Sequence, residues 1–213
     1  HTLEERKSLR LHQPINNPIF KDDTESQNMR WSKFKDFEPK TMFDIVQNKV
    51  FPFIKNMGGD KFAQYMKDAV FMIPSAGLLA SAVDMISNLD MSDSDTKGDL
   101  YEYLLSKIAQ AGVNGQFRTP RHIGKMMVEL ADIQPNDIIC DPACGTAGFL
   151  ICAVQYLKEK HSEMFYDAKS LDHFNNNMLY GYDFDYSMLR IASMNMMTHG
   201  ISNPNISYQD SLS

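Results

Sequence analysis

The chain has 213 residues, of which 43% are hydrophobic and 23% are charged, and its formal net charge is −6 at pH 7. This is the composition of an ordinary globular protein, and no apolar run approaches the roughly 20 residues that cross a bilayer, so we exclude a membrane-spanning protein and expect a cytoplasmic one. The negative balance also excludes nucleic-acid binding by bulk charge, so any such contact needs a local basic surface or a partner.

Residues 1–40 are polar, are interrupted by prolines and carry an acidic cluster at 22–25. This composition predicts an extended, weakly ordered N-terminal arm. Trp31, Phe34 and Phe37 stand out at helical spacing. We expect these three aromatic residues to pack the arm onto the body of the protein.

The pattern becomes helical at Thr41, where apolar residues recur three and four positions apart. Thr41 is a candidate N-cap, and Pro52 is expected to end or kink the first helix because proline has no N–H to donate. No convincing strand pattern interrupts this region, which predicts an all-helical domain over 41–111. Its expected helices cover 41–59, 60–74, 75–90 and 93–112.

From residue 112 onward strand and helix patterns alternate, which predicts an α/β domain over 112–213 with a parallel, doubly wound sheet. Its first helix is expected to have Thr119 as N-cap and Pro120 at the first helical position, and to run to about Ala131. Three strands are few for such a sheet, so we expect an incomplete domain. The expected strands cover 136–143, 177–184 and 205–210, with helices at 146–160 and 187–200 between them.

The segment DPACGTAGFL, which begins at Asp141, follows the first of these strands. In open α/β sheets the ligand lies beyond the carboxyl ends of the strands, and Gly145 and Gly148 would let the backbone come close to it. A dinucleotide fingerprint, G-x-G-x-x-G, fits poorly, because Ala143 stands at the first glycine and the next strand-end acid, Asp183, comes too late. An acid at Asp141 favours a cationic group over a pyrophosphate.

The same segment resembles motif I of the amino-methyltransferases that use S-adenosylmethionine, a cofactor that carries an α-ammonium and a sulfonium group. Three further segments, in the family's order, resemble the modification (M) subunits of type I restriction enzymes: GDLYEYLLSKIA, GQFRTPR and LRIASMNMMTHGI. Together the four segments span about 98–210, and the helical region before them is similar to the family's N-terminal domain. The resemblance implies a Rossmann-like methyltransferase domain behind a helical domain.

The resemblance also implies where S-adenosylmethionine binds. Asp183 would accept hydrogen bonds from the ribose hydroxyls, and Asp210 would meet the adenine amino group. The free N–H groups at the helix start near Thr119 would face the carboxylate. Two sets of residues would enclose the methionine part: Asp141, Gly145, Thr146, Ala147 and Gly148 on one side, and Gln116, Phe117, Arg118, Thr119, Pro120 and Arg121 on the other.

Several of these residues have a second interpretation. Asp185 competes with Asp183 for the ribose or else caps the next helix, and Asp210 is alternatively a turn residue. Arg118 and Arg121 are alternatively surface charges, and Arg118 stands where the family often has an aromatic residue. The three cysteines are too few and too unevenly spaced for a disulfide framework or a zinc site, so we expect no metal.

Adenine-N6 methylation in this family depends on an Asn-Pro-Pro-aromatic loop after the fourth strand, which grips the target amino group and stacks on the flipped base. No Asn-Pro-Pro occurs in this sequence. We therefore expect no catalytic residue in these 213 residues, place the loop beyond Ser213, and expect the fragment to be inactive alone.

The resemblance implies that the full protein transfers a methyl group to adenine N6 in DNA, at a site chosen by a separate specificity subunit. It also implies a restriction subunit and a second copy of the modification subunit as partners. One alternative is a single-chain adenine methyltransferase fused to its own recognition or nuclease region. The others are a non-catalytic assembly module with a vestigial pocket and a nicotinamide dehydrogenase.

Overall fold

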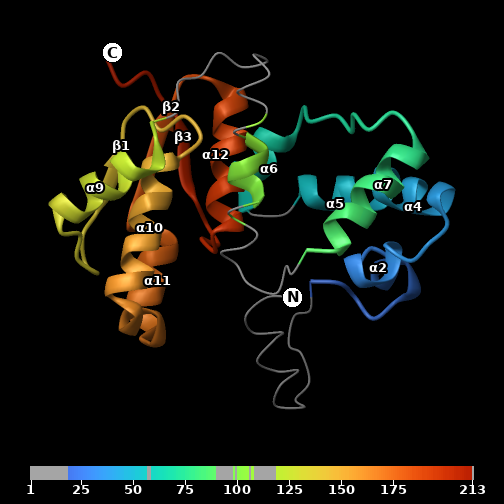
Figure 1. Ribbon diagram of the computed structural model, residues 1–213, viewed down its shortest axis with the longest axis horizontal. Helices are drawn as coiled ribbons and strands as arrows, with labels where there is room; N and C mark the ends of the chain where they lie inside the picture. Colours follow the sequence, from blue (N-terminus) through green and yellow to red (C-terminus); the bar gives the residue numbers. More distant parts are fainter. Residues whose placement is uncertain are drawn as a thin grey trace. The chain divides into compact units, whose positions relative to one another are not determined.

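The computed structural model describes residues 19–56, 59–89, 98, 100–105, 107 and 119–212, and they form two compact units (Figure 1). The first unit is helical and holds the described residues up to Ile54 together with Val70–Leu89. The second holds Lys55–Ala69 and the described residues from Gly98 onward, including a parallel sheet. Within the described ranges, no helix has the length and apolar character needed to cross a membrane. The predicted combination of helices and a parallel sheet is confirmed.

A small apolar core holds the first unit together, and its buried members are Phe34, Met42, Leu79 and Val83. The arm expected over 1–40 is not extended where the structure describes it, because Asp23 caps a short helix and the Phe34 ring is buried. Packing of this aromatic residue is confirmed. The helices of the first unit are α2 (Thr24–Asn28), α3 (Trp31–Phe34), α4 (Pro39–Ile45), η1 (Val46–Val50), α5 (Phe51–Lys55) and α7 (Ala76–Ser87).

The helix predicted from Thr41 begins earlier and passes through Pro52. It starts with Pro39 at its first turn, after Glu38 rather than Thr41 as N-cap. Pro52 does not end it, because η1 is a π-helical turn that joins α4 to α5. The Phe51 N–H donates to the Val46 carbonyl, five residues back, so the change of hydrogen-bond register falls immediately before the residue that lacks an N–H.

The helix predicted over 60–74 ends at Met66, and the resulting α6 (Gly59–Met66) belongs to the unit that contains the sheet. The buried Tyr65 explains why α6 belongs to this unit. Its hydroxyl donates to the Ile206 carbonyl at 3.0 Å, and the Tyr65 carbonyl accepts a hydrogen bond from Arg190 Nε at 2.9 Å. The single helical domain expected over 41–111 therefore does not coincide with one compact unit.

The sheet consists, among the described residues, of three parallel strands in the order β1 (Ile139–Asp141), β2 (Leu179–Asp183) and β3 (Asn205–Tyr208). Each lies inside a stretch predicted to be a strand. Asp141 pairs with Gly181 and Asp183 pairs with Tyr208. The register therefore brings the ends of the three strands to one edge of the sheet.

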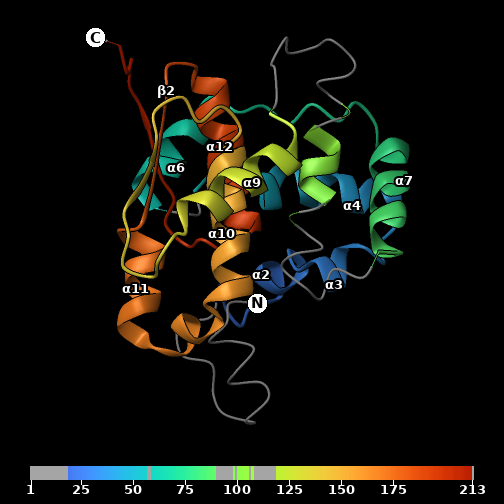
Figure 2. The same ribbon diagram turned by 60° about the vertical axis from the view of Figure 1, so that its left-hand side comes forward.

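Two helices connect the strands and cover one face of the sheet. α10 (Gly148–Lys160) follows β1 and α12 (Tyr186–Thr198) follows β2; because the two helices contact each other, they lie on the same face. α10 contacts both α12 and α9 (Arg121–Ala131) and lies between them in Figure 1, and Figure 2 shows the same helices from a second direction. The core between the helices and the sheet contains the fully buried side chains of Leu150, Val154, Leu157, Leu189, Met196 and Ile206.

Two features of this unit differ from the prediction. α9 begins at Arg121 with Pro120 as its N-cap, so Thr119 lies outside the helix. No side chain caps this end, because the proline ring carries no hydrogen-bond acceptor. No prediction covered η2 (Ser162–Tyr166) or α11 (Ala168–Asn176). The start of α11 has a recognisable N-cap residue in the sequence. Asp167 caps the helix by accepting a hydrogen bond from the Ser170 N–H at 2.8 Å.

The described residues between 98 and 107 are helical and are tied to α12. Gly98 is buried against the His199 ring, so that a Cβ at this position would lie 2.3 Å from His199 Nε2. The Tyr101 hydroxyl donates to the Ile191 carbonyl at 3.4 Å. Burial lowers the pKa of His199, which keeps the ring neutral at this contact.

We expect Gly98→Ala to destabilise the protein by about 2 kcal/mol, because the new methyl group overlaps an imidazole ring that has no space to move. Urea unfolding measures this loss. Gly77→Ala in helix α7 is the matched control, since a methyl group added there would have no neighbouring atom within 4 Å, and it should stabilise by up to about 1 kcal/mol. The cost of Gly98→Ala should shrink in a His199→Ala background; an unchanged cost contradicts the contact.

Candidate functional site

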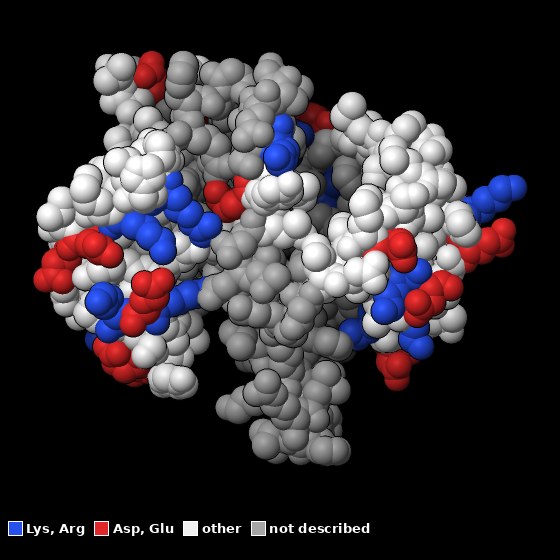
Figure 3. Space-filling model, viewed as in Figure 1, with Lys and Arg blue, Asp and Glu red and all other residues white. Residues whose placement is uncertain are grey.

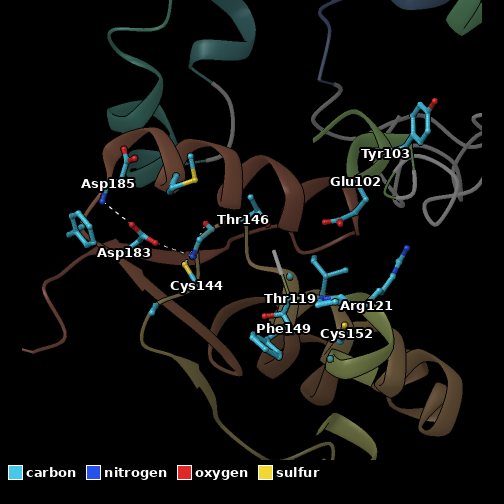
Figure 4. Close-up of a pocket in the computed structure, with 18 residues that line it drawn as sticks. Glu102, Tyr103, Thr119, Arg121, Cys144, Thr146, Phe149, Cys152, Asp183 and Asp185 are labelled. Atoms are coloured by element: carbon cyan, nitrogen blue, oxygen red, sulfur yellow. Dashed lines mark hydrogen bonds between the residues drawn. The ribbon is translucent and has the colours of Figure 1, made fainter. Parts of the chain in front are cut away.

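A cavity of about 650 Å³ opens at the carboxyl ends of β1 and β2, within the second unit (Figure 4). This is the volume of a small-molecule site. The turn between β1 and α10 lines one side, together with Asp183 and Asp185 at the end of β2. The start of α9 and the helical residues Glu102 and Tyr103 line the other side.

The turn between β1 and α10 is tightly closed. Gly145 has a φ of 52° and Ala147 a φ of 64°, both in the left-handed region. The Ala147 N–H donates to the Cys144 carbonyl at 2.7 Å, and the Cys144 N–H donates to the Tyr182 carbonyl of β2 at 2.9 Å. A left-handed alanine is strained, so the surrounding hydrogen bonds and the complete burial of its methyl group hold it in place.

The Asp183 carboxylate joins the two loops at the floor of the cavity (Figure 4). Its Oδ2 accepts a hydrogen bond from the Gly145 N–H at 3.0 Å, and its Oδ1 accepts one from the Asp185 N–H at 2.8 Å. Asp185 in turn accepts from the Ser187 N–H at 2.7 Å as the N-cap of α12. The capping interpretation of Asp185 is confirmed, although its side chain also lines the cavity.

Asp141 is not among the residues that line the cavity. Its Oδ1 accepts a hydrogen bond from the Ala143 N–H at 3.1 Å, while its Oδ2 is buried and has no hydrogen-bond partner among the described residues. Burial raises the pKa of Asp141, and the nearby negative charge of Asp183 raises it further. The site therefore contains an under-satisfied carboxylate, for which a positive charge nearby would be favourable.

Two cysteines line the cavity and are unreactive in this setting. Burial raises the pKa of the Cys144 thiol to about 12, with further contributions from Asp141 and Asp183. Burial also raises the pKa of Cys152. Because the thiolate is the nucleophile, neither sulfur is suited to covalent catalysis near neutral pH. Their role is packing, and all three cysteines of the chain are free.

The structure brings together seven of the thirteen predicted site residues in the cavity lining: Thr119, Pro120, Arg121, Gly145, Thr146, Gly148 and Asp183. Asp141 and Ala147 belong to the same turn but are not among the lining residues. Asp210 is exposed beyond the end of β3, where it accepts a hydrogen bond from the Leu212 N–H at 3.0 Å, as in the turn interpretation. The predicted residues Gln116, Phe117 and Arg118 lie outside the described residues.

Other lining residues were missed by the sequence reasoning. Glu102 and Tyr103 come from a helix far upstream of the glycine turn, and no local pattern marks them as facing a cavity. Phe149 and Met188 follow the two strand ends, and their places in α10 and α12 were predictable from the helix starts. Groups of three or more side chains suited to holding a metal ion do not occur among the described residues.

We expect Asp141→Asn to raise the thermal stability of the protein at neutral pH. The folded-state pKa of Asp141 is raised, so its favourable contribution is complete only below its unfolded pKa and is lost as the pH rises through the folded value. Thermal unfolding between pH 4 and pH 8 should therefore show a gain for the asparagine variant that grows with pH. Asp68→Asn, at an exposed site, is the control and should show no such trend.

Comparison with known proteins identifies the family to which the chain belongs. The family model described as N-6 DNA Methylase matches residues 92–213. The methylase subunit of the type I restriction enzyme EcoEI of Escherichia coli is 30% identical over 182 residues, which cover 84% of this chain and 36% of that protein. The type II restriction enzyme and methyltransferase RM.BcgI of Heyndrickxia coagulans is 32% identical over 123 residues, 55% of this chain and 19% of that protein.

The fold also occurs in a crystal structure from Vibrio vulnificus YJ016, assigned to a type I restriction enzyme as its modification subunit. That structure matches with a TM-score of 0.73 at 22% identity and covers 98% of this chain and 46% of that one. The present chain thus spans about a third of the EcoEI subunit's length, as its 36% coverage shows. Since the family model matches more than half of the 213 residues, the chain belongs to the N-6 DNA methylase family.

Proposed function

We propose that this chain is the S-adenosylmethionine-binding part of a type I modification subunit. The whole protein then transfers a methyl group to adenine N6 in DNA, at a site chosen by a specificity subunit. The family match over 92–213 and the similarity to the EcoEI methylase subunit support this proposal. The observation that carries it is the cavity at the strand ends, whose glycine turn and Asp183 are joined by a hydrogen bond.

The charges of the cavity favour S-adenosylmethionine over a dinucleotide. The described lining contains three acids, Glu102, Asp183 and Asp185, and one base, Arg121. A pyrophosphate would place two negative charges among these acids, whereas S-adenosylmethionine carries a net positive charge. The buried Oδ2 of Asp141, which has no hydrogen-bond partner among the described residues, adds to this preference. The attraction between opposite charges is stronger in such a site than in water, because the site is partly desolvated.

The proposed contacts follow the two sides of the cavity. Asp183 keeps lone pairs for the ribose hydroxyls, because each of its oxygens accepts one backbone N–H and a carboxylate oxygen accepts two hydrogen bonds. Residues 145–148 lie against the methionine part, and the start of α9 lies near its carboxylate. Asp210 is not part of the described lining, so a contact between it and the adenine amino group rests on the family resemblance alone. The bound cofactor supplies a methyl group on a sulfonium.

DNA contact in this proposal depends on partners, because the chain carries a net charge of −6. On the face shown in Figure 3, basic and acidic side chains are interspersed over the described residues of each unit. We propose a cytoplasmic assembly of the modification protein, as two copies, with the specificity and restriction subunits. The specificity subunit reads the sequence, and a basic surface on it would supply the affinity for phosphates that this chain lacks.

A second candidate is a single chain that carries its own recognition and nuclease regions. It is favoured by one observation, the 32% identity to RM.BcgI, which carries both restriction enzyme and methyltransferase in its name. The residues of the cavity are compatible with both candidates, because both need the same cofactor. The two differ in what the methylation requires.

Methylation by the full-length protein, with and without a co-expressed specificity subunit, tests the proposal. Mass spectrometry of the DNA measures N6-methyladenine. We expect the product only when both proteins are present. N6-methyladenine made by the single chain alone would favour the second candidate, and a full-length protein that binds no S-adenosylmethionine would support a non-catalytic assembly module instead.

We expect Asp183→Asn to weaken S-adenosylmethionine binding by about 10- to 100-fold, because a charged acceptor for the ribose is lost. Calorimetric titration measures the affinity, and NAD should bind neither protein measurably. The variant also disturbs the hydrogen bond to Gly145, so a 2′,3′-dideoxy analogue of S-adenosylhomocysteine separates the two effects. If Asp183 binds the ribose, the variant should discriminate less between this analogue and S-adenosylhomocysteine than the unaltered protein does; equal discrimination would assign Asp183 to the turn alone.

A further inference from the structure

The Glu102 side chain is fixed at the wall of the cavity by a buried amide. Asn195 Nδ2, in α12, donates to Glu102 Oε1 at 2.6 Å and to the Thr146 carbonyl at 2.8 Å. Asn195 is fully buried, so these two acceptors hold both amide hydrogens away from solvent. The opposite amide orientation would face its oxygen toward a carboxylate and a carbonyl, which excludes it. One side chain thus ties Glu102 to the glycine turn.

The backbone that carries Glu102 is held as firmly as its side chain. Gly98 rests on the His199 ring, and the Tyr101 hydroxyl donates to the Ile191 carbonyl. Gly98 lies one helical turn before Glu102, and Tyr101 is the residue directly before it. The carboxylate is therefore presented to the cavity from a fixed position, opposite the pair of acids at the end of β2 (Figure 4).

The charges at this end of the cavity are of both signs. Burial raises the pKa of the Cys152 thiol, the Arg121 charge lowers it, and the Glu102 charge raises it. Both side chains line the cavity, on the side away from Asp183 and Asp185 (Figure 4). An anion and a cation on one side of a cavity match the two ends of an α-amino acid group, whose ammonium and carboxylate are joined through one carbon atom.

We propose that Glu102 binds the α-ammonium group of the cofactor's methionine end, with Arg121 beside the carboxylate. The inference rests on the proposed function, because it assigns one part of the same cavity to one part of S-adenosylmethionine. It leaves Asp183 at the other end for the ribose. Asn195 is then a positioning residue, which fixes the Glu102 carboxylate and the Thr146 carbonyl relative to each other.

The variant Glu102→Gln tests the proposal, because glutamine keeps an oxygen that accepts from Asn195 and loses only the charge. Calorimetric titrations of the full-length protein use three ligands: S-adenosylmethionine, its decarboxylated form, and 5′-methylthioadenosine, which lacks the amino acid end. We expect the first two to bind at least about tenfold more weakly to the variant, since each carries the ammonium group. 5′-Methylthioadenosine should bind both proteins equally, which also shows that the variant is folded.

The matched control is Glu129→Gln, which removes the same charge from an exposed position on α9 away from the cavity lining and should change none of the three affinities. Unchanged binding of S-adenosylmethionine by Glu102→Gln would overturn the inference and leave the proposed function standing. A loss confined to the carboxylated ligand would also overturn it, because the effect would then come through Arg121. No binding by the unaltered full-length protein would contradict the proposed function itself.

Discussion

The Asp183 carboxylate accepts one backbone N–H from each of the two loops that begin at neighbouring strand ends, and the arrangement of the cavity follows from these two hydrogen bonds. They are possible because β1 and β2 are parallel and in register, which brings the turn at Gly145 and the start of α12 to the same edge. Both donors are fixed in the main chain. The floor of the cavity is thus formed before any ligand arrives, which lowers the ordering cost of binding.

The same floor concentrates negative charge where the protein partly excludes water. Asp141 contributes a buried oxygen without a partner among the described residues, and Asp183 lies close enough to raise its pKa further. Such an arrangement is unfavourable for the empty protein and favourable once a cation is present. If the proposed cofactor binds here, local stability is given up in exchange for binding that depends on the charge of the ligand, a common relation between folding and function.

The sequence predicted the sheet unit better than the cavity wall. The three strands lie inside apolar stretches bounded by turn residues, and α10 and α12 follow them at the predicted places. α11 was missed because Phe174 is its only buried residue, which leaves too little apolar periodicity to detect. The glycine turn and Asp183 are recognisable from adjacent residues, whereas Glu102 is held at the cavity by contacts that are distant in sequence, such as the hydrogen bond from Asn195, 93 positions later. Likewise, Tyr65 belongs with the sheet because its hydroxyl donates to the Ile206 carbonyl. That partner lies 141 positions away, so no local pattern could predict the contact.

The long sequence separation of the Asn195 contacts has a consequence for how the protein is made. The segment around Gly98 and Glu102 leaves the ribosome well before α12 is synthesised, so its resting place on His199 and Asn195 does not yet exist. The turn at Thr146 is likewise synthesised 49 residues before Asn195, whose amide donates to the Thr146 carbonyl. Contacts of such high order form late, because the chain between them must first be ordered. A nascent chain that has paired β1 with β2 therefore holds the floor of the cavity but not its opposite wall, and it completes the proposed cofactor site only after the C-terminal turn of α12 has emerged.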